Sequence, residues 1–148
     1  MLTFQEHAGG PTGRLKYEIR RNGALIEDVD EQNIIVDLSK QIHAKLLGGS
    51  VTGQSVTQIG FGTSGAAAAA GNTSLTGAYV KAIDSVTYPA TNKVQFNFSL
   101  GSGEANGKAI LEFGLFIAAG TLYARRIRTS ALNKDSDISL SGSWTITF

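Results

Sequence analysis

The chain has 148 residues, of which 42% are apolar and 17% are charged. This length and apolar content fit a single domain with its own core and exclude a disordered chain. Thirteen Lys and Arg residues balance twelve Asp and Glu residues, and the net charge of +1 excludes a global attraction to nucleic acid or an anionic membrane. The absence of cysteine excludes disulfides, thiolate metal sites and cysteine nucleophiles.

Two features of the composition favour a β-rich protein that assembles with other chains. Charged residues make up 17% of the chain, below the usual ~25%, and glycine supplies 18 of the 148 residues, a larger share than the usual ~7%. Glycine-rich chains with few charges are typical of turn-rich β structure, and their surface lacks the groups that keep monomers apart. No apolar stretch reaches the roughly 18–20 residues that a membrane span needs, so we expect no membrane partner.

The first elements are an arm and a β-hairpin. Residues 1–13 are polar and glycine-rich, and we expect a flexible or partner-bound arm ahead of a single domain over residues 14–148. Residues 15–20 alternate apolar and charged side chains, which is typical of a half-buried strand. Asn22-Gly23 then predicts a tight turn, because both central positions of a type I′ turn need positive φ. The return strand is expected over about residues 24–29.

A short helix is predicted over Leu38–Leu47. Leu38, Ile42 and Leu46 form one apolar stripe at helical spacing. Asp37 is a suitable N-cap, and Gly48 is expected at C′. Because ten residues are too few for a stable isolated helix, this helix must dock on a sheet.

The remaining chain predicts six more strands separated by turns and loops. In the last strand, Trp144 shares a face with other apolar residues, the last of which is Phe148, and Trp144 is expected in the core. Strands without alternating helices favour a sandwich or a closed antiparallel sheet. We therefore predict a mainly β fold, an antiparallel, jelly-roll-like β-sandwich of about eight strands with one short helix packed on it. The six strands cover about Val56–Phe61, Tyr79–Tyr88, Lys93–Leu100, Ala109–Ile117, Thr121–Arg128 and Asp137–Phe148.

Two glycine-rich segments resemble phosphate-binding loops only superficially. Residues 60–65 match G-x-G-x-x-G, but Gly71 and Asn72 interrupt the long helix that a dinucleotide site requires. Residues 101–107 lack the lysine of a P-loop. Both segments are predicted to be inter-strand loops, and we expect no cofactor.

The histidines and acidic residues do not predict a catalytic or metal site. His7 lies in the arm, and His43 is expected at the boundary of the helix without a third ligand at metal spacing. No G-x-S-x-G motif accompanies them. The acidic residues 27, 28, 30 and 31 are expected at a solvated hairpin edge, with a calcium site as the less favoured interpretation.

Arg125, Arg126 and Arg128 form a basic patch on one strand. Arg126 and Arg128 share a face, and Arg125 lies opposite. No aromatic residues that could stack on bases alternate with them, so an ion-paired interface with an acidic neighbour is favoured over nucleic-acid binding. Together with the arm, our candidate contact residues are Tyr17, Ile19, Arg125, Arg126 and Arg128.

Seven segments of the chain carry a resemblance to a known family through their sequence and their order. The segments are residues 33–36, 56–63, 73–76, 100–107, 112–116, 120–126 and 138–148. In this order they resemble a family of small structural proteins of tailed bacteriophages and prophages. The resemblance covers about residues 33–148 and implies a tail-fibre-like, baseplate-associated or other virion protein. It implies synthesis in the bacterial host cytoplasm, location in the virion, and contacts with other virion proteins and with copies of the same chain, for which a trimer is one arrangement. No catalytic motif is carried over.

The favoured function is therefore that of a non-enzymatic structural protein in the tail, baseplate or fibre of a phage, which acts through contacts between subunits. A decoration (cement) protein on the phage head is the first alternative. A receptor- or glycan-binding module is the second and would need exposed aromatics, for which the candidates are Tyr79, Tyr88, Tyr123 and Trp144. The third alternative, an enzyme, would need an oxygen-only site around Glu104, Glu112 or Asp135.

Overall fold

The computed structural model describes residues 9–148, which form nine β-strands and one α-helix. The predicted mainly β fold with one short helix is confirmed. Most of the predicted arm, including His7, lies outside the described residues. The elements are β1 (Thr12–Arg21), β2 (Ala24–Ile35), α1 (Leu38–Leu47), β3 (Val56–Gly62), β4 (Tyr79–Ala82), β5 (Ser85–Ala90), β6 (Lys93–Leu100), β7 (Ala109–Ile117), β8 (Leu122–Asn133) and β9 (Ile138–Thr147).

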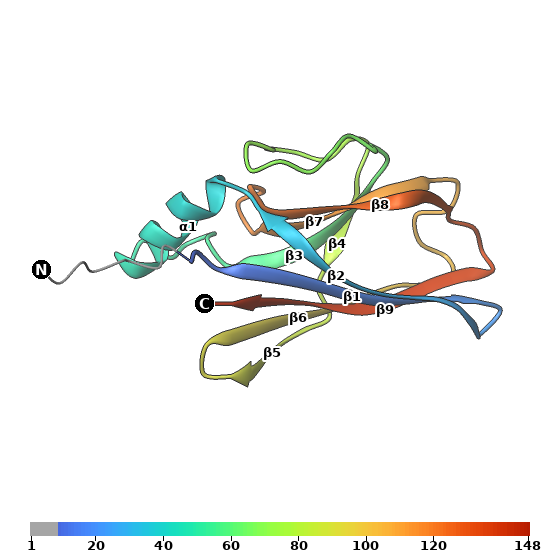
Figure 1. The fold of residues 1–148 in the computed structure, drawn as a ribbon, viewed down its shortest axis with the longest axis horizontal. Coiled ribbons are helices and arrows are strands. Elements are labelled where there is room, and N and C mark those ends of the chain that lie inside the picture. Colours follow the sequence, from blue (N-terminus) through green and yellow to red (C-terminus); the bar gives the residue numbers. More distant parts are fainter. Residues whose placement is uncertain (1–8) are drawn as a thin grey trace, which may run out of the picture.

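The strands form one curled antiparallel sheet in the order β4-β3-β7-β8-β2-β1-β9-β6-β5. Figure 1 shows two layers, with β3, β4, β7 and β8 above and β1, β9, β6 and β5 below. On one side β2 bridges the layers, but it pairs with β8 only at Ile34↔Arg125 and Ile35↔Ala124. The interior between the layers is therefore closed there mainly by side chains.

On the other side the layers are joined by a bend within a single predicted strand. The Ile83 N–H donates to the Thr57 carbonyl of β3, at 3.0 Å, whereas the Asp84 N–H donates to the Asn97 carbonyl of β6, at 2.7 Å. Two consecutive residues thus bond to different layers. The segment 79–88 is two strands instead of the predicted one, which gives nine strands where about eight were expected.

The β1–β2 hairpin has the predicted turn. Asn22 and Gly23 have φ of 49° and 82°, as a type I′ turn requires. The register shifts just beyond the turn, because Arg20 pairs with Leu25 while Ile19 pairs with Glu27. Ile26 is the extra residue of this β-bulge, which places two consecutive apolar residues near the tip of the hairpin.

The core lies between the layers and contains the inner faces of both. Trp144 is fully buried, as predicted, and its indole N–H donates to Asn33 Oδ1 at 2.7 Å. Gly142 continues this inner face, where an added Cβ would collide with the Lys16 carbonyl oxygen and the Tyr17 side chain. The buried core includes Leu15, Ile19, Ile59, Phe61, Phe98, Leu100, Ile110, Phe113, Leu115 and Leu140.

Helix α1 covers one end of the layers and has the predicted bounds, but its caps differ from the prediction. Asp37 already has helical backbone angles and makes no side-chain cap hydrogen bond; its carboxylate instead lies 3.3 Å from Lys40 Nζ. Gly48 has a φ of −81°, and its N–H donates to the Ala44 carbonyl, so the helical turn continues through it. Gly49, with φ +85°, takes the left-handed position. Within residues 9–148, no helix has the length and apolar character needed to cross a bilayer.

Candidate functional site: an apolar pocket at the helical end

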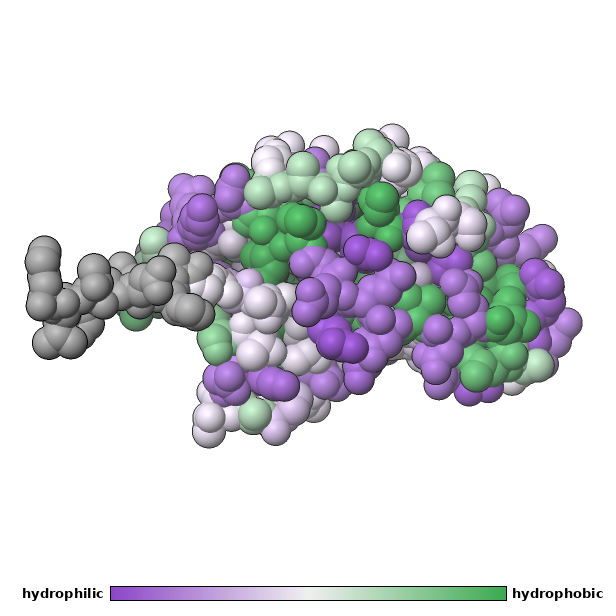
Figure 2. Space-filling view, viewed as in Figure 1, coloured by the Kyte–Doolittle hydropathy of each residue, from purple (hydrophilic) through white to green (hydrophobic). Residues whose placement is uncertain are grey.

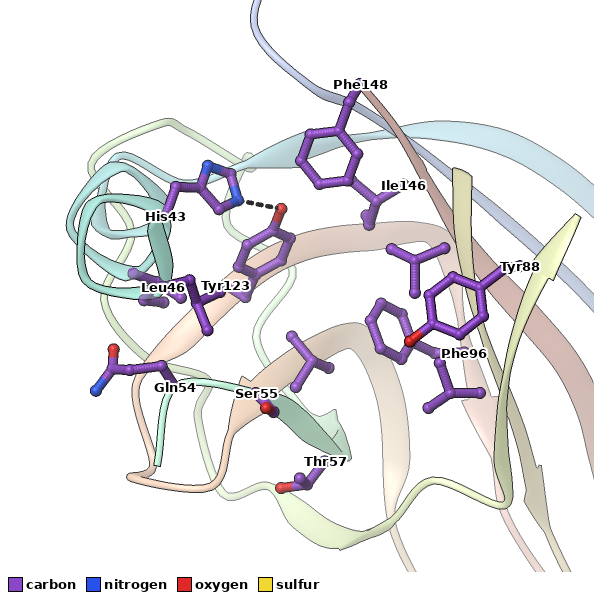
Figure 3. A pocket seen from close by; sticks show the side chains of 14 residues that line it. His43, Leu46, Gln54, Ser55, Thr57, Tyr88, Phe96, Tyr123, Ile146 and Phe148 are labelled. Atoms are coloured by element: carbon purple, nitrogen blue, oxygen red, sulfur yellow. Dashed lines mark hydrogen bonds between the residues drawn. The ribbon is translucent and has the colours of Figure 1, made fainter. Parts of the chain in front are cut away.

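An open pocket of about 550 Å³ lies between the layers at the end covered by α1; we call it the end pocket. Figure 3 shows its walls, which come from α1 and from β3, β5, β6, β8 and β9. Among the described residues 9–148, none that lines the pocket is Asp, Glu, Lys or Arg. The lining residues are Ile42, His43, Leu46, Gln54, Ser55, Val56, Thr57, Val86, Tyr88, Val94, Phe96, Tyr123, Ile146 and Phe148.

The rim of the end pocket is apolar and open to solvent. Tyr88 is 76% exposed and Phe148 is 63% exposed, and Leu46 and Val86 are also exposed. Phe148 was predicted on the same face of the last strand as Trp144 and Ile146. It does share the pocket with Ile146 (Figure 3), but it lies beyond the last paired residues of the strand and stays uncovered. Phe148 therefore belongs to the exposed rim of the pocket and not to the buried core.

One wall carries a histidine–tyrosine pair that is neutral at neutral pH. His43 Nε2 and the Tyr123 hydroxyl are hydrogen-bonded at 2.8 Å, and the two rings meet edge to face (Figure 3). Burial lowers the pKa of His43 and raises the pKa of Tyr123, so both uncharged forms are favoured. His43 also packs edge to face against Phe148. The pair therefore gives the pocket polar atoms without giving it charge.

The predicted contact residues lie largely inside the folded chain. Ile19, Tyr17, Arg125 and Arg128 are buried, and only Arg126 is partly exposed. The alternation of β1 indicates a half-buried strand, and its apolar side faces the core of this chain. Because the four buried side chains are covered by the chain itself, they are not available to a neighbouring protein, and a contact surface must use other residues.

The basic patch meets its acidic partner within the same chain. Arg128 donates to Glu27 at 2.9 Å and to the Tyr17 hydroxyl at 2.6 Å, and Arg126 is paired with Glu31 at 2.8 Å. These pairs lie where β2 separates from β8, and they close the gap between the layers. Two members of the predicted acidic cluster thus form ion pairs across this seam, and their side chains remain partly exposed to solvent, as expected for a hairpin edge. Asp30, on the other face of β2, is exposed beside Arg14.

A second internal pair fixes the glycine-rich loop of residues 63–78. Glu112 is fully buried and accepts from Arg125 Nε at 2.8 Å and from the backbone N–H groups of Ser64 and Thr76. Arg125 also donates to the Ala66 carbonyl at 2.9 Å. Because Gly62 has no side chain, the Glu112 side chain can occupy the space beside its backbone. The loop has no helix, so the G-x-G-x-x-G match reflects close packing, as the loop interpretation predicted.

The loop of residues 101–107 is fixed by Lys134 and Glu104. Lys134 is almost completely buried, and its Nζ donates to Asn106 Oδ1 at 2.9 Å and to the Ser102 and Asp135 carbonyls. Glu104 accepts from Lys81, from the Tyr79 hydroxyl and from the Gly101 N–H, and the bond from Lys81 is the main cause of its lowered pKa. Among residues 9–148, no three His, Cys, Asp or Glu side chains are grouped as a metal site would require.

The aromatic candidates for glycan binding are dispersed. Trp144 and Tyr123 are buried, and Tyr79 is hydrogen-bonded to Glu104. Of these four residues, only Tyr88 is largely exposed. The exposed aromatic surface at the end pocket therefore combines Tyr88 with Phe148, a combination that the sequence alone did not reveal.

Comparison of the chain with models of known families, with curated proteins and with solved structures gave no match.

Proposed function

We propose that this chain is a non-enzymatic structural component of a bacteriophage particle, associated with the tail, baseplate or fibre, and that it acts through contacts between subunits. The observation that carries the proposal is the apolar rim of the end pocket, where Tyr88 and Phe148 are mostly exposed. Contiguous exposed apolar surface around a concavity is typical of a protein–protein interaction site. That the assembly is a bacteriophage particle is inferred from the resemblance of residues 33–148 to phage structural proteins.

The way the chain uses its charges supports this role. Glu112 and Arg125 fix a loop, Arg128 closes the seam between the layers, and Lys134 fixes another loop. Within residues 9–148, every buried polar side-chain atom has a hydrogen-bond partner. Such a frame is rigid, and a rigid frame presents a contact surface with little loss of conformational entropy on binding.

Incorporation into particles tests the proposal with a matched pair of variants. Val86 is 41% exposed on the rim of the end pocket, and Val80 is 42% exposed on β4 away from it. We expect Val86→Glu to be absent from purified phage particles, because a charge would be buried in the contact, and Val80→Glu to be incorporated like the wild type.

The position in the particle is tested by gold-labelled antibodies in electron microscopy. Label on tails or baseplates is the expected result, whereas label over the head surface would replace the tail assignment with the decoration role. A protein that is absent from all particles and stays monomeric in solution would contradict the proposal. Equal incorporation of both variants would show that the end pocket is not the contact surface.

A further inference from the structure

The two ends of the molecule carry complementary apolar features. The β1–β2 hairpin projects at the end opposite α1 (Figure 1), and α1 forms one wall of the end pocket. Leu25 and Ile26, near its tip, are 49% and 48% exposed, and Figure 2 shows apolar side chains gathered at this end. One end thus has a projection with two exposed apolar side chains beside two ion-paired arginines, which we call the hairpin tip (residues 20–26), and the other has an apolar hollow.

We propose that the hairpin tip of one copy inserts into the end pocket of the next copy, so that the chains assemble head to tail. The inference rests on the proposed role in assembly and names the partner of the end pocket: a second copy of this chain. The residues in contact are Leu25 and Ile26 of one copy and Leu46, Val86 and Tyr88 of the other.

Neither surface would bring an unpaired charge into this contact. At the tip, Arg20 is paired with Glu18 at 2.8 Å and Arg21 with Asp137 at 3.2 Å within the chain. The described lining of the pocket has no Asp, Glu, Lys or Arg, and burial favours neutral His43. Burying an uncompensated charge at an interface is strongly unfavourable, and the contact avoids this because each arginine of the tip already has an acidic partner.

The hairpin tip is also preorganised for insertion. The Asn22 N–H donates to the Asp137 carbonyl at 2.8 Å, which ties the turn to the start of β9. The bulge at Ile26 places it next to Leu25 at the projecting end of the hairpin. Because both features are part of the sheet frame, little ordering is required on binding.

A head-to-tail contact accounts for both exposed apolar features, whereas symmetric pairings do not. Two hollows facing each other would leave a void, and two tips in contact would leave the pocket uncovered. A heterologous contact covers the tip and the pocket with one interface and repeats from copy to copy. Such a contact gives a ring if the rotation per step closes and a filament if it does not.

Mixing two variants tests this geometry directly. We expect the native mass of the wild type to rise with concentration up to about 1 mM, and Ile26→Glu and Val86→Glu each to remain monomeric. Ile26→Glu keeps an intact pocket and Val86→Glu keeps an intact tip, so a 1:1 mixture is expected to form a heterodimer and nothing larger. Val80→Glu is the matched control and should associate like the wild type. Circular dichroism and thermal melting verify that each variant is folded.

Cross-linking locates the contact, because the chain has no cysteine of its own. A chain with Ile26→Cys mixed with a chain with Tyr88→Cys should form a disulfide-linked heterodimer under mild oxidation. Pairing Ile26→Cys with Val80→Cys is the control and should give at least tenfold less product.

Three results would overturn the inference: a wild type that stays monomeric at about 1 mM, an Ile26→Glu variant that associates normally, or a mixture that forms no heterodimer. If Ile26→Glu associates normally but removal of residues 1–8 abolishes association, the N-terminal segment is the occupant of the pocket instead. The virion role is tested separately. A cross-linked heterodimer of a protein absent from particles would refute only that role, and normal incorporation of Ile26→Glu into particles would refute only the tip contact.

Discussion

Neutralising Glu112 is expected to destabilise this protein more than any surface charge change. The Glu112 and Arg125 side chains are 1% and 3% exposed, and their ion pair is 2.8 Å long. Glu112 Oε1 also accepts the N–H groups of Ser64 and Thr76, the latter at 2.7 Å. Glu112→Gln retains the size of the side chain but leaves the Arg125 guanidinium buried without a counter-charge. Its amide must also turn its NH₂ either toward Arg125 or toward the two backbone donors.

The magnitude follows from the burial of the pair. Removing one partner of a buried ion pair costs about 3–5 kcal/mol. Because Gln still accepts one set of hydrogen bonds, we expect the lower figure, about 3 kcal/mol of unfolding free energy. For a domain of this size, each kcal/mol shifts Tm by about 2–4 °C, so Tm should fall by roughly 6–12 °C. By contrast, Lys40→Gln breaks only the exposed pair with Asp37 and should cost less than about 1 kcal/mol.

Urea unfolding and hydrogen exchange measure this effect. The Ser64 and Thr76 amides should exchange faster in Glu112→Gln, because their acceptor is weakened. The double variant with Arg125→Met should cost less than the sum of the single variants, since it removes the uncompensated charge. A Glu112→Gln protein within about 1 kcal/mol of the wild type, or strictly additive costs, would refute this account of the pair.

Three further predictions concern the core, the pocket wall and a buried lysine. Gly142→Ala should destabilise the protein by about 1–3 kcal/mol or more in urea unfolding, because its Cβ would collide with a backbone oxygen, whereas Gly103→Ala has open space and should be close to neutral. Burial lowers the pKa of His43 below its ordinary 6.5, so the unfolded chain binds the proton first as pH falls. Its contribution to stability should therefore decline from about pH 6.5 downward through the folded-state pKa, and His43→Gln should flatten the pH dependence of unfolding in that window. Lys134→Met leaves three oxygen acceptors without their donor and should cost about 1–3 kcal/mol, with faster exchange in residues 101–107; unchanged stability would contradict the role assigned to this lysine.

Elements specified by neighbouring residues were predictable. The Asn22-Gly23 turn and the Leu38–Leu47 helix both have the predicted positions, because their signals lie within a few residues of the structure they specify. The bend at residues 83–84 was not predictable in the same way. No glycine or proline marks a break between Tyr79 and Tyr88, and the change of partner from β3 to β6 depends on where those strands lie in space.

The candidate site was harder to predict for the same reason. The acidic residues of β2 and the arginines of β8 were both identified, but Arg128 and Glu27 are 101 positions apart in the chain, and their pairing is decided by the curl of the sheet. The end pocket likewise combines α1, β5 and the last residue of the chain. No single segment shows that Val86, Tyr88 and Phe148 share one rim, because each belongs to an ordinary strand pattern.

The distribution of charge supports the proposed association at the two ends over an association along the layers. Asp30 lies beside Arg14 and Lys16 and keeps hydrated side chains along β1 and β2, and a neighbour packed there would have to remove that water. At the hairpin tip, Leu25 and Ile26 are exposed beside the ion-paired Arg20 and Arg21, and the end pocket has an apolar rim. Burying these apolar side chains is favourable in proportion to their area. Both features belong to a rigid frame, which would fix the rotation between successive copies. One contact used repeatedly would then produce a single type of ring or filament, as the proposed role in a particle requires.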